Sequence, residues 1–455
     1  MKIEFIKRGA ATRLILIFAG WSTDSRYYND CVFDGWDTAV VSDYRDMAMP
    51  SIPDQYATVY VFAYSLGVAA ASLCGIEAAV RIAICGSPEA VSDRFGIPEA
   101  VYAGTLDGLS ERSLMKFHLR MAGDKATYDS IRDRLSQTPD IPGLKEELSS
   151  IRTAVKGRMA YADINFDRVY LAEADRIFPY ANLKAYWEGY GKAPVVAVQS
   201  SHAIDIHSII TDCLPDCEAI GGGFAKAGST YNDSAVIQKE ICCKIGNSLS
   251  RLVVENGFSP RSVLEIGVGQ GLLTQVWRDV VMPRKATYID LAEMPTFGIA
   301  PEERYLETDA ELWLERSDER FDLIVSASTI QWFADPIRFM SSLKSHLNPG
   351  GIALISTFVK GNLHELDKVR PCPMIYRTVE DYMSSTDCVA EIWERTLTFE
   401  SVKDMLMHLR LTGVNPKKSS FRKNNQSQDG AGMMKKLTAF PVQLTYCPMI
   451  MVVKA

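Results

Sequence analysis

The stretch V-L-E-I-G-V-G-Q-G, Val263 to Gly271, decides how the second half of the chain folds. Its apolar start is typical of a buried strand, and Gly267, Gly269 and Gly271 predict a tight turn that leads into a helix from Leu272. Glycine at such a turn lets the backbone bend sharply and lets a ligand approach without a Cβ in its way. A strand, a glycine turn and a helix N-terminus therefore predict a ligand site at the edge of an α/β sheet.

An acidic residue closes the next strand, A-T-Y-I-D, at Asp290, about 20 residues further on, where a carboxylate can accept hydrogen bonds from both ribose hydroxyls. With Glu265 before the first glycine, the whole pattern resembles motif I of the class I S-adenosylmethionine-dependent methyltransferases. The resemblance implies S-adenosylmethionine as the cofactor, bound by the glycine turn together with Glu265 and Asp290. A Rossmann dinucleotide site and a purely structural turn are the alternatives, but the G-x-G-x-G spacing favours the methyltransferase.

Length and composition limit the classes of protein that fit. A chain of 455 residues favours two or three domains, and 47% hydrophobic with 23% charged residues is ordinary for a globular protein. No apolar run reaches membrane-spanning length, and the charged N-terminus lacks the apolar stretch of a signal peptide. A net charge of −7 argues against nonspecific nucleic-acid binding, and an acidic protein partner would need a local basic patch.

The ten cysteines are scattered and form no C-x-x-C pair, so no metal site is expected. Cys213 and Cys217 are spaced C-x-x-x-C, but few histidines lie near them. Unpaired thiols fit a reducing compartment, and the cytoplasm is the expected location.

Short apolar runs alternate with helical patterns from Met1 to about residue 211, and they predict a buried parallel sheet. The expected strands lie at Leu14–Phe18, from Thr38, at Thr58–Phe62, from Arg81, from Arg168 and at Pro194–Gln199. A charged helical stretch, from about residue 111 to 158, interrupts the series and is read as a lid over an active site or as a solvated helical face.

A serine stands at a predicted strand-to-helix turn in A-Y-S-L-G, Ala63 to Gly67. A serine on such a turn is the nucleophile elbow of α/β-hydrolases, which predicts Ser65 as the nucleophile. The usual elbow has glycine where this chain has Ala63, so an ordinary surface serine is the alternative.

An acid and a histidine follow the later strands in the hydrolase order Ser, Asp, His. Asp175 comes just after a strand and is the predicted acid, with Asp163 and Asp167 as alternatives. His202 comes after the last strand and is the predicted base, with His207 as its rival.

The chemistry of this set follows from its residue types. His202 takes the proton of Ser65, and Asp175 holds the imidazole tautomer and stabilises the imidazolium. The backbone N–H groups of Trp21 and Leu66 are the predicted oxyanion-hole donors. His118 lies in the charged helical stretch and is expected to be structural.

Four segments together give a closer resemblance: F-A-G-W-S, A-Y-S-L-G, D-R-I-F-P-Y-A-N and the later Ser-His. They look like the BioG-type pimeloyl-ACP methyl ester esterases of biotin synthesis, over most of residues 1 to 210. The resemblance implies hydrolysis of pimeloyl-ACP methyl ester and acyl carrier protein as a partner. Basic side chains are the candidates for docking this acidic protein: Lys116, Arg120 and Arg152 in the lid stretch, and Lys417, Lys418, Arg422 and Lys423 in the second half.

A glycine- and proline-containing segment, residues 213–223, is the expected linker between a hydrolase domain at 1–212 and a methyltransferase domain at 224–455. The helix expected at Phe224–Gln238 resembles the entry segment of the BioC-type malonyl-ACP O-methyltransferases of biotin synthesis. The resemblance implies that Tyr231 closes over the cofactor, with Gln238 behind it. An amphipathic helix that merely packs on the sheet is the alternative.

Later segments fit the same methyltransferase fold: a strand is expected in Phe321–Trp332 with residues 326–331 at its carboxyl end, a helix end, turn and strand in Leu347–Phe358, and a strand pair at the end of the chain. The resemblance implies that Asp309 contacts the adenine amino group and that Ser326 lies at the ligand end of its strand. Methyl transfer to a carboxylate that is already ionised needs no general base, so positioning is the expected source of catalysis.

The sequence thus predicts an N-terminal α/β-hydrolase with a helical lid and a C-terminal Rossmann-like class I methyltransferase. The leading hypothesis is one enzyme that methylates malonyl-ACP and hydrolyses pimeloyl-ACP methyl ester. One alternative treats the first half as a non-catalytic docking domain for acyl carriers. The other is a small-molecule carboxyl methyltransferase with a lipase-like domain.

Overall fold

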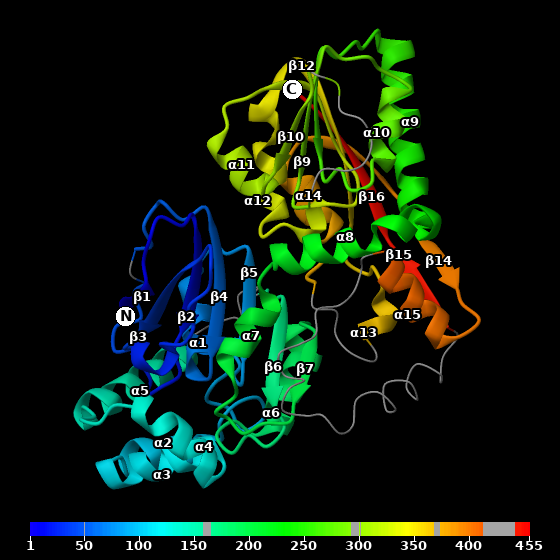
Figure 1. Ribbon diagram of the computed structural model, residues 1–455. Coiled ribbons are helices and arrows are strands. Elements are labelled where there is room, and N and C mark those ends of the chain that lie inside the picture. Colours follow the sequence, from blue (N-terminus) through cyan, green and yellow to red (C-terminus); the bar gives the residue numbers. More distant parts are fainter. Residues whose placement is uncertain (50, 158–164, 293–299, 301, 368–373, 413–441) are drawn as a thin grey trace. The chain divides into compact units, whose positions relative to one another are not determined.

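The computed structural model describes the chain except residues 50, 158–164, 293–299, 301, 368–373 and 413–441, and it leaves the side chains of residues 225–233 undescribed. The chain forms two compact units, Met1–Thr211 and Asp212–Ala455 (Figure 1). Within the described ranges, no helix is both long and apolar enough to cross a bilayer.

The first unit is built on a seven-stranded sheet in the order β1-β3-β2-β4-β5-β6-β7. Its strands are β1 (Lys2–Lys7), β2 (Arg13–Phe18), β3 (Asp37–Ser42), β4 (Thr58–Tyr64), β5 (Val80–Ile84), β6 (Arg168–Ala172) and β7 (Val195–Val198). All neighbours are parallel except β1, which runs antiparallel to β3. The sequence did not predict β1, because its K-I-E-F-I-K alternation belongs to a half-exposed edge strand rather than to a buried apolar run.

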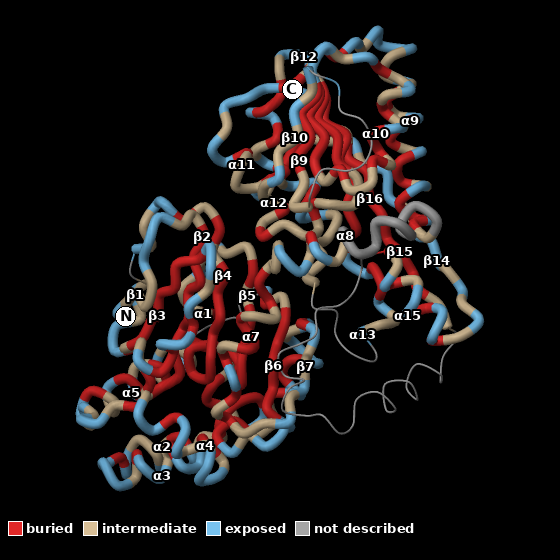
Figure 2. Tube along the Cα trace, viewed as in Figure 1, coloured by how far each residue is buried: buried red, intermediate tan, exposed pale blue. Residues whose placement is uncertain are grey.

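The β2 strand lies in the interior of this sheet, between β3 and β4, and its residues Leu14 to Phe18 are fully buried. A continuous apolar run suits a parallel strand whose two faces are both covered. Figure 2 shows the buried residues concentrated along these strands. The carboxyl ends of β2, β4, β6 and β7 carry the loops that form the first candidate site.

Helices connect the strands of the first unit: η1 (Ser25–Tyr28), α1 (Leu66–Cys74), α2 (Glu99–Asp107), α3 (Glu111–Ala122), α4 (Lys125–Ile131), η2 (Arg132–Arg134), α5 (Ile141–Lys156), α6 (Tyr180–Tyr186), η3 (Trp187–Gly191, a π-helical turn) and α7 (Ile206–Cys213). Side-chain caps begin α3 at Ser110 and α5 at Asp140. The helical insertion between β5 and β6 starts with α2, earlier than the predicted boundary near residue 111. Sequence reasoning missed α2 because its polar and apolar residues are not separated onto two faces as clearly as those of α3.

The second unit contains a seven-stranded sheet in the order β10-β9-β8-β11-β12-β16-β13 and a two-stranded sheet of β14 and β15. Its strands are β8 (Ser262–Ile266), β9 (Lys285–Asp290), β10 (Arg304–Glu307), β11 (Phe321–Ser326), β12 (Leu347–Phe358), β13 (Cys388–Ile392), β14 (Arg395–Thr398), β15 (Gln443–Tyr446) and β16 (Pro448–Lys454). The expected terminal strand pair is divided, since β15 pairs with β14 while β16 enters the large sheet between β12 and β13.

The helices of the second unit are α8 (Cys217–Ser234), α9 (Val236–Asn256), α10 (Leu272–Arg278), α11 (Ala310–Arg316), η4 (Ile330–Trp332), α12 (Pro336–Ser342), η5 (Leu343–His346), α13 (His364–Asp367), α14 (Val379–Ser385) and α15 (Val402–Leu411). The α8 helix begins inside the segment that the sequence predicted as a linker. Gly221 is buried in it, and a Cβ there would come within 3.2 Å of the carbonyl oxygen of Leu291. This glycine therefore permits close packing of a helix instead of marking a loop.

Both faces of the large sheet in the second unit are covered by apolar side chains. Val263 and Val325 belong to the buried cluster on one face, and their neighbours Leu264 and Ile324 belong to the cluster on the other. Alternate residues of a strand point to opposite faces, so a strand that is apolar throughout is buried on both sides. The sheet is doubly covered, as expected for a Rossmann-like fold.

The insertion is anchored to the first sheet through a buried carboxyl group. Glu147 of α5 is only 7% exposed, and its Oε1 accepts a hydrogen bond of 3.2 Å from the backbone N–H of Tyr44, just after β3. Removal from water penalises the charged form, and this burial raises the pKa of Glu147 to about 7.

We predict that Glu147→Gln stabilises the chain at pH 8 but not at pH 4.5. Folded Glu147 has a pKa above its usual 4.5, so the wild type loses stability as pH rises from about 4.5 to about 7 and stays level above that range. Glutamine keeps the acceptor for Tyr44 and has no charge to bury, which should be worth up to about 3 kcal/mol at pH 8. Urea unfolding of both proteins across this range measures the difference, and a gap that does not change with pH would contradict the burial argument.

Candidate functional sites

Ser65 lies on a strained turn between β4 and α1. Its φ of 58° and ψ of −125° are unusual for a residue with a side chain, and only 4% of its surface is exposed. Two glycines make room for this turn, because a Cβ at Gly67 would collide with the carbonyl of Phe18 and one at Gly86 would collide with the carbonyl of Ser65. The missing Cβ atoms of Gly67 and Gly86 therefore leave the space that the backbone of this strained turn needs.

Ala63, which departs from the usual elbow glycine, is part of β4 itself. It is fully buried and pairs with Phe18 of β2 and with Ala83 of β5. The close approach at this turn is made by Gly67 and Gly86, so alanine at position 63 does not prevent the elbow from forming.

Three side chains form a continuous hydrogen-bonded array. The Nε2 of His202 lies 2.9 Å from Oγ of Ser65, and its Nδ1 lies 2.7 Å from Oδ2 of Asp175. The side chains of His202 and Asp175 are 1% and 0% exposed. Asp175 follows β6 and His202 follows β7, so the parallel strands bring both to the end of the sheet where Ser65 lies. This geometry can transfer a proton from a serine hydroxyl to an imidazole that a carboxylate orients.

Neighbouring groups hold the members of this array in place. The other oxygen of Asp175 accepts hydrogen bonds from the backbone N–H groups of Ile177 at 2.7 Å and Phe178 at 2.9 Å. The hydroxyl of Tyr64 donates to the carbonyl of His202 at 2.8 Å. The Phe178 ring stacks on the imidazole at 6.1 Å between centroids. Tyr64 was not singled out from the sequence, although its place inside the elbow motif was a usable signal.

The alternative acids and histidines lie elsewhere. Asp167 accepts a hydrogen bond from the N–H of Arg81 at 2.7 Å, and His207 approaches the carbonyl of Asp30 at 2.9 Å. Asp163 lies outside the described residues. His118 is buried on α3, with Nε2 at 3.0 Å from Oγ of Ser22, and burial lowers its pKa to about 4.

The backbone donors predicted for an oxyanion hole are the N–H groups of Trp21 and Leu66. Within the part of the chain that the structure describes, the N–H groups of Trp21 and Leu66 have no hydrogen-bond acceptor. The loop after β2 lies against the nucleophile turn, because a Cβ at Gly20 would come within 3.3 Å of Cβ of Ser65. Unpaired backbone donors beside a nucleophile are the groups that stabilise a developing oxyanion.

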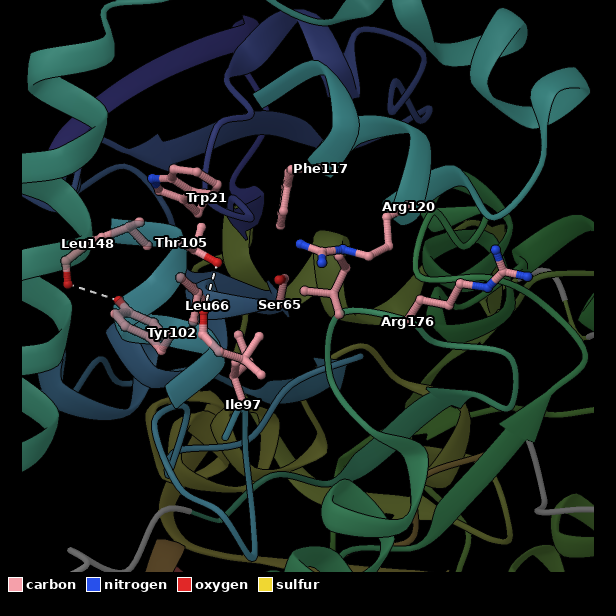
Figure 3. A pocket seen from close by; sticks show the side chains of 12 residues that line it. Trp21, Ser65, Leu66, Ile97, Tyr102, Thr105, Phe117, Arg120, Leu148 and Arg176 are labelled. Atoms are coloured by element: carbon pink, nitrogen blue, oxygen red, sulfur yellow. Dashed lines mark hydrogen bonds between the residues drawn. The ribbon is translucent and has the colours of Figure 1, made fainter. Parts of the chain in front are cut away.

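A pocket opens above Ser65 (Figure 3). Its walls are mostly aromatic and aliphatic and come largely from α2, α3 and α5: Trp21, Leu66, Ile97, Val101, Tyr102, Thr105, Phe117, Leu148 and Ile177. Arg120 and Arg176 complete the lining, and the figure shows them on the opposite side of Ser65 from Trp21 and Leu148. An apolar pocket with a nucleophile at its floor suits an acyl chain.

Cys85 lies beside the array, with its sulfur within 4.8 Å of ligand atoms of Asp175 and His202. Both ring nitrogens of His202 are already engaged by Ser65 and Asp175. Burial raises the pKa of the Cys85 thiol, so it stays protonated, and a neutral thiol is a weak metal ligand. The arrangement favours the hydrogen-bonded array over a metal site.

The basic residues proposed for carrier docking have different surroundings. Arg152 forms an ion pair with Glu99 of α2, which also binds Lys156 at 2.7 Å. Lys116 is exposed on α3, and Arg120 lines the pocket. Arg152 therefore has an intramolecular partner that a docking role would have to displace. Lys417, Lys418, Arg422 and Lys423 lie outside the described residues.

In the second unit, the glycine turn follows β8 as the sequence predicted. Gly267, Gly269 and Gly271 have φ values of 73°, 52° and 77°, and Gly271 caps α10. A Cβ at Gly267 would collide with the side chain of Thr329, whereas a Cβ at Gly269 would meet none of the described residues within 4 Å. The turn is thus packed on one side and open on the other, where a ligand can approach.

The acids near this turn are held by different partners. Oδ2 of Asp290 accepts the N–H of Gly269 at 2.7 Å, and burial raises the pKa of Asp290. Glu265 is fully buried, and its Oε2 accepts from Thr274 at 2.8 Å and Trp277 at 2.7 Å. Burial raises the pKa of Glu265 to about 7. Glu265 therefore braces α10 from within the core, while Asp290 lies at the turn.

The remaining predicted cofactor residues have these positions. Oδ1 of Asp309 caps α11 by accepting the N–H of Glu311 at 2.9 Å. Ser326 is fully buried and donates to the carbonyl of Ile266 at 2.9 Å, so its hydroxyl ties β11 to β8. Thr329, which was not predicted, is the side chain from this segment that packs against Gly267. Tyr231 lies on α8 among residues whose side chains are not described.

The open side of the glycine turn fits a nucleoside cofactor. Space above Gly269 and an acceptor on Asp290 beside it are what an adenosyl ligand requires. The positive φ values keep the turn tight enough for the backbone to approach the ligand.

Comparison with known proteins finds similar sequences for both units. The sequence profile described as pimeloyl-ACP methyl esterase BioG matches residues 1–209, and the one described as methyltransferase domain matches residues 237–395. A malonyl-[acyl-carrier protein] O-methyltransferase of Bacteroides fragilis is 29% identical over 418 residues, which span 88% of this chain and 84% of the relative. One of Calditerrivibrio nitroreducens is 32% identical, over 42% of this chain and 78% of the relative. The crystal structure of BioG from Haemophilus influenzae is 28% identical, covers 45% of this chain and 94% of its own, and superposes with a TM-score of 0.42.

These findings and the glycine turn define an S-adenosylmethionine-dependent methyltransferase with a Rossmann-like fold, joined to a BioG domain. The chain belongs to the malonyl-[acyl-carrier protein] O-methyltransferase family. The two resemblances drawn from the sequence motifs are thereby confirmed, and so is S-adenosylmethionine as the cofactor.

We predict that Gly269→Ala weakens S-adenosylmethionine binding at least about tenfold, because its Cβ projects into the open space above the turn. Gly257→Ala is the matched control: Gly257 has a similar φ of 62°, open space around it, and a place at the end of α9. Both substitutions should cost about 1–2 kcal/mol of stability from backbone strain. Calorimetric titration measures the cofactor affinity of the two variants, and thermal unfolding measures their stability. Equal affinity in both variants would contradict the placement of the cofactor above Gly269.

Proposed function

We propose that this chain is a bifunctional enzyme of biotin synthesis. Its first unit, an α/β-hydrolase with α2 to α5 as a lid, hydrolyses the methyl ester of pimeloyl-acyl carrier protein. Its second unit methylates the free carboxylate of malonyl-acyl carrier protein. The observation that carries the esterase half is the array of Ser65, His202 and Asp175 at the floor of an apolar pocket. The family membership supports the methyltransferase half.

The esterase reaction follows from the array. His202 removes the proton of Ser65 as its oxygen attacks the ester carbonyl, and the N–H groups of Trp21 and Leu66 stabilise the oxyanion. The protonated His202 then returns the proton to the departing methoxide, which leaves as methanol. Water, deprotonated by His202, cleaves the acyl-serine ester and restores Ser65, with the carboxylic acid as product.

The second unit needs positioning more than acid–base groups. Bound S-adenosylmethionine supplies the methyl group. Asp290 is placed to bind the ribose hydroxyls, and the Gly267–Gly271 turn lets the backbone approach the cofactor. The malonyl carboxylate is ionised near neutral pH, so this unit has to align it with the methyl group and exclude water.

The two activities oppose each other unless they act on different chain lengths. A methyl ester hides a carboxylate that an apolar fatty-acid elongation pocket would otherwise have to bury, and burying an unpaired charge is far more costly. The ester must be removed once the chain has grown. We therefore assign the lid helices the role of selecting the longer acyl chain in the pocket above Ser65.

The alternative of a non-catalytic docking domain is less well supported. A docking surface has no need of a strained Ser65, two aligned hydrogen bonds to His202, or two unpaired backbone donors. A small-molecule carboxyl methyltransferase with a lipase-like domain is disfavoured by the similarity to malonyl-[acyl-carrier protein] O-methyltransferases, which extends over 88% of the chain.

We predict that Ser65→Ala lowers hydrolysis of pimeloyl-carrier methyl ester by about a thousandfold or more and leaves methylation of malonyl-carrier protein unchanged. The reason is that the nucleophile is lost while the glycine turn belongs to another unit. His207→Gln, in the same unit, is the control and should retain both activities. Both reactions are followed by mass spectrometry of the carrier protein. Undiminished hydrolysis by the alanine variant would refute the assignment of the nucleophile.

The chain-length argument predicts that kcat/KM for hydrolysis is about a hundredfold higher for the pimeloyl than for the malonyl methyl ester on the carrier. Roughly four more buried methylenes at about 0.8 kcal/mol each amount to about 3 kcal/mol, if the transition state makes use of this binding. Steady-state kinetics on the two carrier-linked esters measures the ratio. Equal values for both esters would show that the pocket does not select length.

A further inference from the structure

The loop after β2 contains a residue in a strained conformation next to a predicted oxyanion-hole donor. Ser22 has a φ of 66°, in the left-handed region that residues with a side chain adopt only when their surroundings hold them. Trp21, whose backbone N–H is a predicted oxyanion-hole donor, directly precedes Ser22 in the chain. The Trp21 N–H belongs to the Gly20–Trp21 peptide, whose carbonyl accepts hydrogen bonds from the N–H of Thr23 at 3.1 Å and from its hydroxyl at 2.7 Å. Ser22 lies inside the turn that these bonds close, so its conformation is part of what sets the orientation of that N–H.

A histidine of the insertion makes that contact. Nε2 of His118, on α3, lies 3.0 Å from Oγ of Ser22, and the histidine is only 7% exposed. Burial lowers the pKa of His118 to about 4, so the imidazole is neutral at physiological pH and pairs with the hydroxyl without a net charge. This hydrogen bond joins two segments that are 96 residues apart in the chain.

Two more contacts attach the same loop to the insertion. The indole Nε1 of Trp21 donates to the carbonyl of Leu144, in α5, at 3.1 Å. The Phe117 ring, next to His118 on α3, packs edge-on against Trp21 with 4.9 Å between centroids. Helices α3 and α5 thus hold Trp21 by its side chain and Ser22 by its hydroxyl.

We infer that His118 is a positioning residue of the esterase, which acts through Ser22 to hold the Trp21 N–H in place for the oxyanion. This inference rests on the proposed esterase function and goes beyond it. It makes the docked state of α3 a condition for the chemical step, in addition to the role of the insertion in binding the acyl chain. A residue that orients an oxyanion donor affects the transition state more than the bound substrate, so its loss lowers kcat and leaves KM nearly unchanged.

The test uses the full chain, three single variants, His118→Phe, Ser22→Ala and His118→Gln, and the double variant that combines the first two. Phenylalanine fills the site but cannot hydrogen-bond, whereas the glutamine amide reaches Ser22 from nearly the same place as Nε2. We expect His118→Phe and Ser22→Ala each to lower kcat for pimeloyl-carrier methyl ester by about 10- to 100-fold, with KM within about twofold. His118→Gln should recover most of the rate, and the Phe and Ala changes combined should cost no more than either alone.

A second readout separates positioning from general structural damage. The affinity for a trifluoromethyl ketone analogue of the pimeloyl ester, which forms a tetrahedral adduct with the nucleophile, should fall by the same factor as kcat. S-adenosylmethionine-dependent methylation by the same variants reports that the chain is folded. Ser22→Ala removes one oxygen and keeps the test decisive if the phenylalanine variant does not fold.

An unchanged kcat in Ser22→Ala, or a rise in KM alone, would overturn the inference and leave the insertion as a binding element only. Additive losses in the double variant would also refute it, because the two residues would then act independently. Absence of hydrolysis and of the ketone adduct in the wild type would instead refute the proposed esterase function itself.

Discussion

A sharp reversal of the backbone at the carboxyl end of a buried parallel strand is the constraint on which both candidate sites depend. After β4 the turn places Ser65 at a φ of 58°, and after β8 it places Gly267 at a φ of 73°. The two turns meet the steric demand in opposite ways. Gly67 and Gly86 leave room around a serine that keeps its side chain, whereas the methyltransferase turn uses glycine at the reversal itself and leaves Gly269 open to a ligand. The same strand-end geometry thus presents the hydroxyl of Ser65 to His202 in one unit and a backbone surface in the other.

Buried acids in this chain differ in function because their partners differ. Asp175 is fully enclosed, yet it accepts two backbone N–H groups and faces His202, which suits a carboxylate that stabilises an imidazolium. Glu265 and Glu147 have fewer donors, and burial raises the pKa of each to about 7. These two residues brace helices against strands. Burial alone therefore does not mark a catalytic acid, and the number and direction of donors decides the difference.

The parts of the fold that sequence reasoning missed share a physical cause. The edge strand β1 and the helix α2 carry weak periodicity, and Gly221 resembles a loop residue until its packing against Leu291 is known. Ser326 stays a predicted cofactor residue, and its hydroxyl donates to the carbonyl of Ile266. Arg152 is a predicted carrier-docking residue, and Glu99 of a neighbouring helix forms an ion pair with it. The contacts of Gly221, Ser326 and Arg152 are made with segments far along the chain, and no local pattern contains them.

The sequence by itself determined the local features: apolar runs for the buried strands, the elbow around Ser65, the glycine turn at Gly267, and the order of serine, acid and histidine. Local steric and burial requirements leave a direct trace in residue type, so these features could be predicted from short segments. Only the tertiary structure decided which acid and which histidine pair with Ser65, because His202 lies 137 residues away and approaches through strand packing. It also decided that His118 reaches Ser22. Contacts of this kind depend on how helices pack over the end of a sheet, and the chain does not encode that packing in any one stretch.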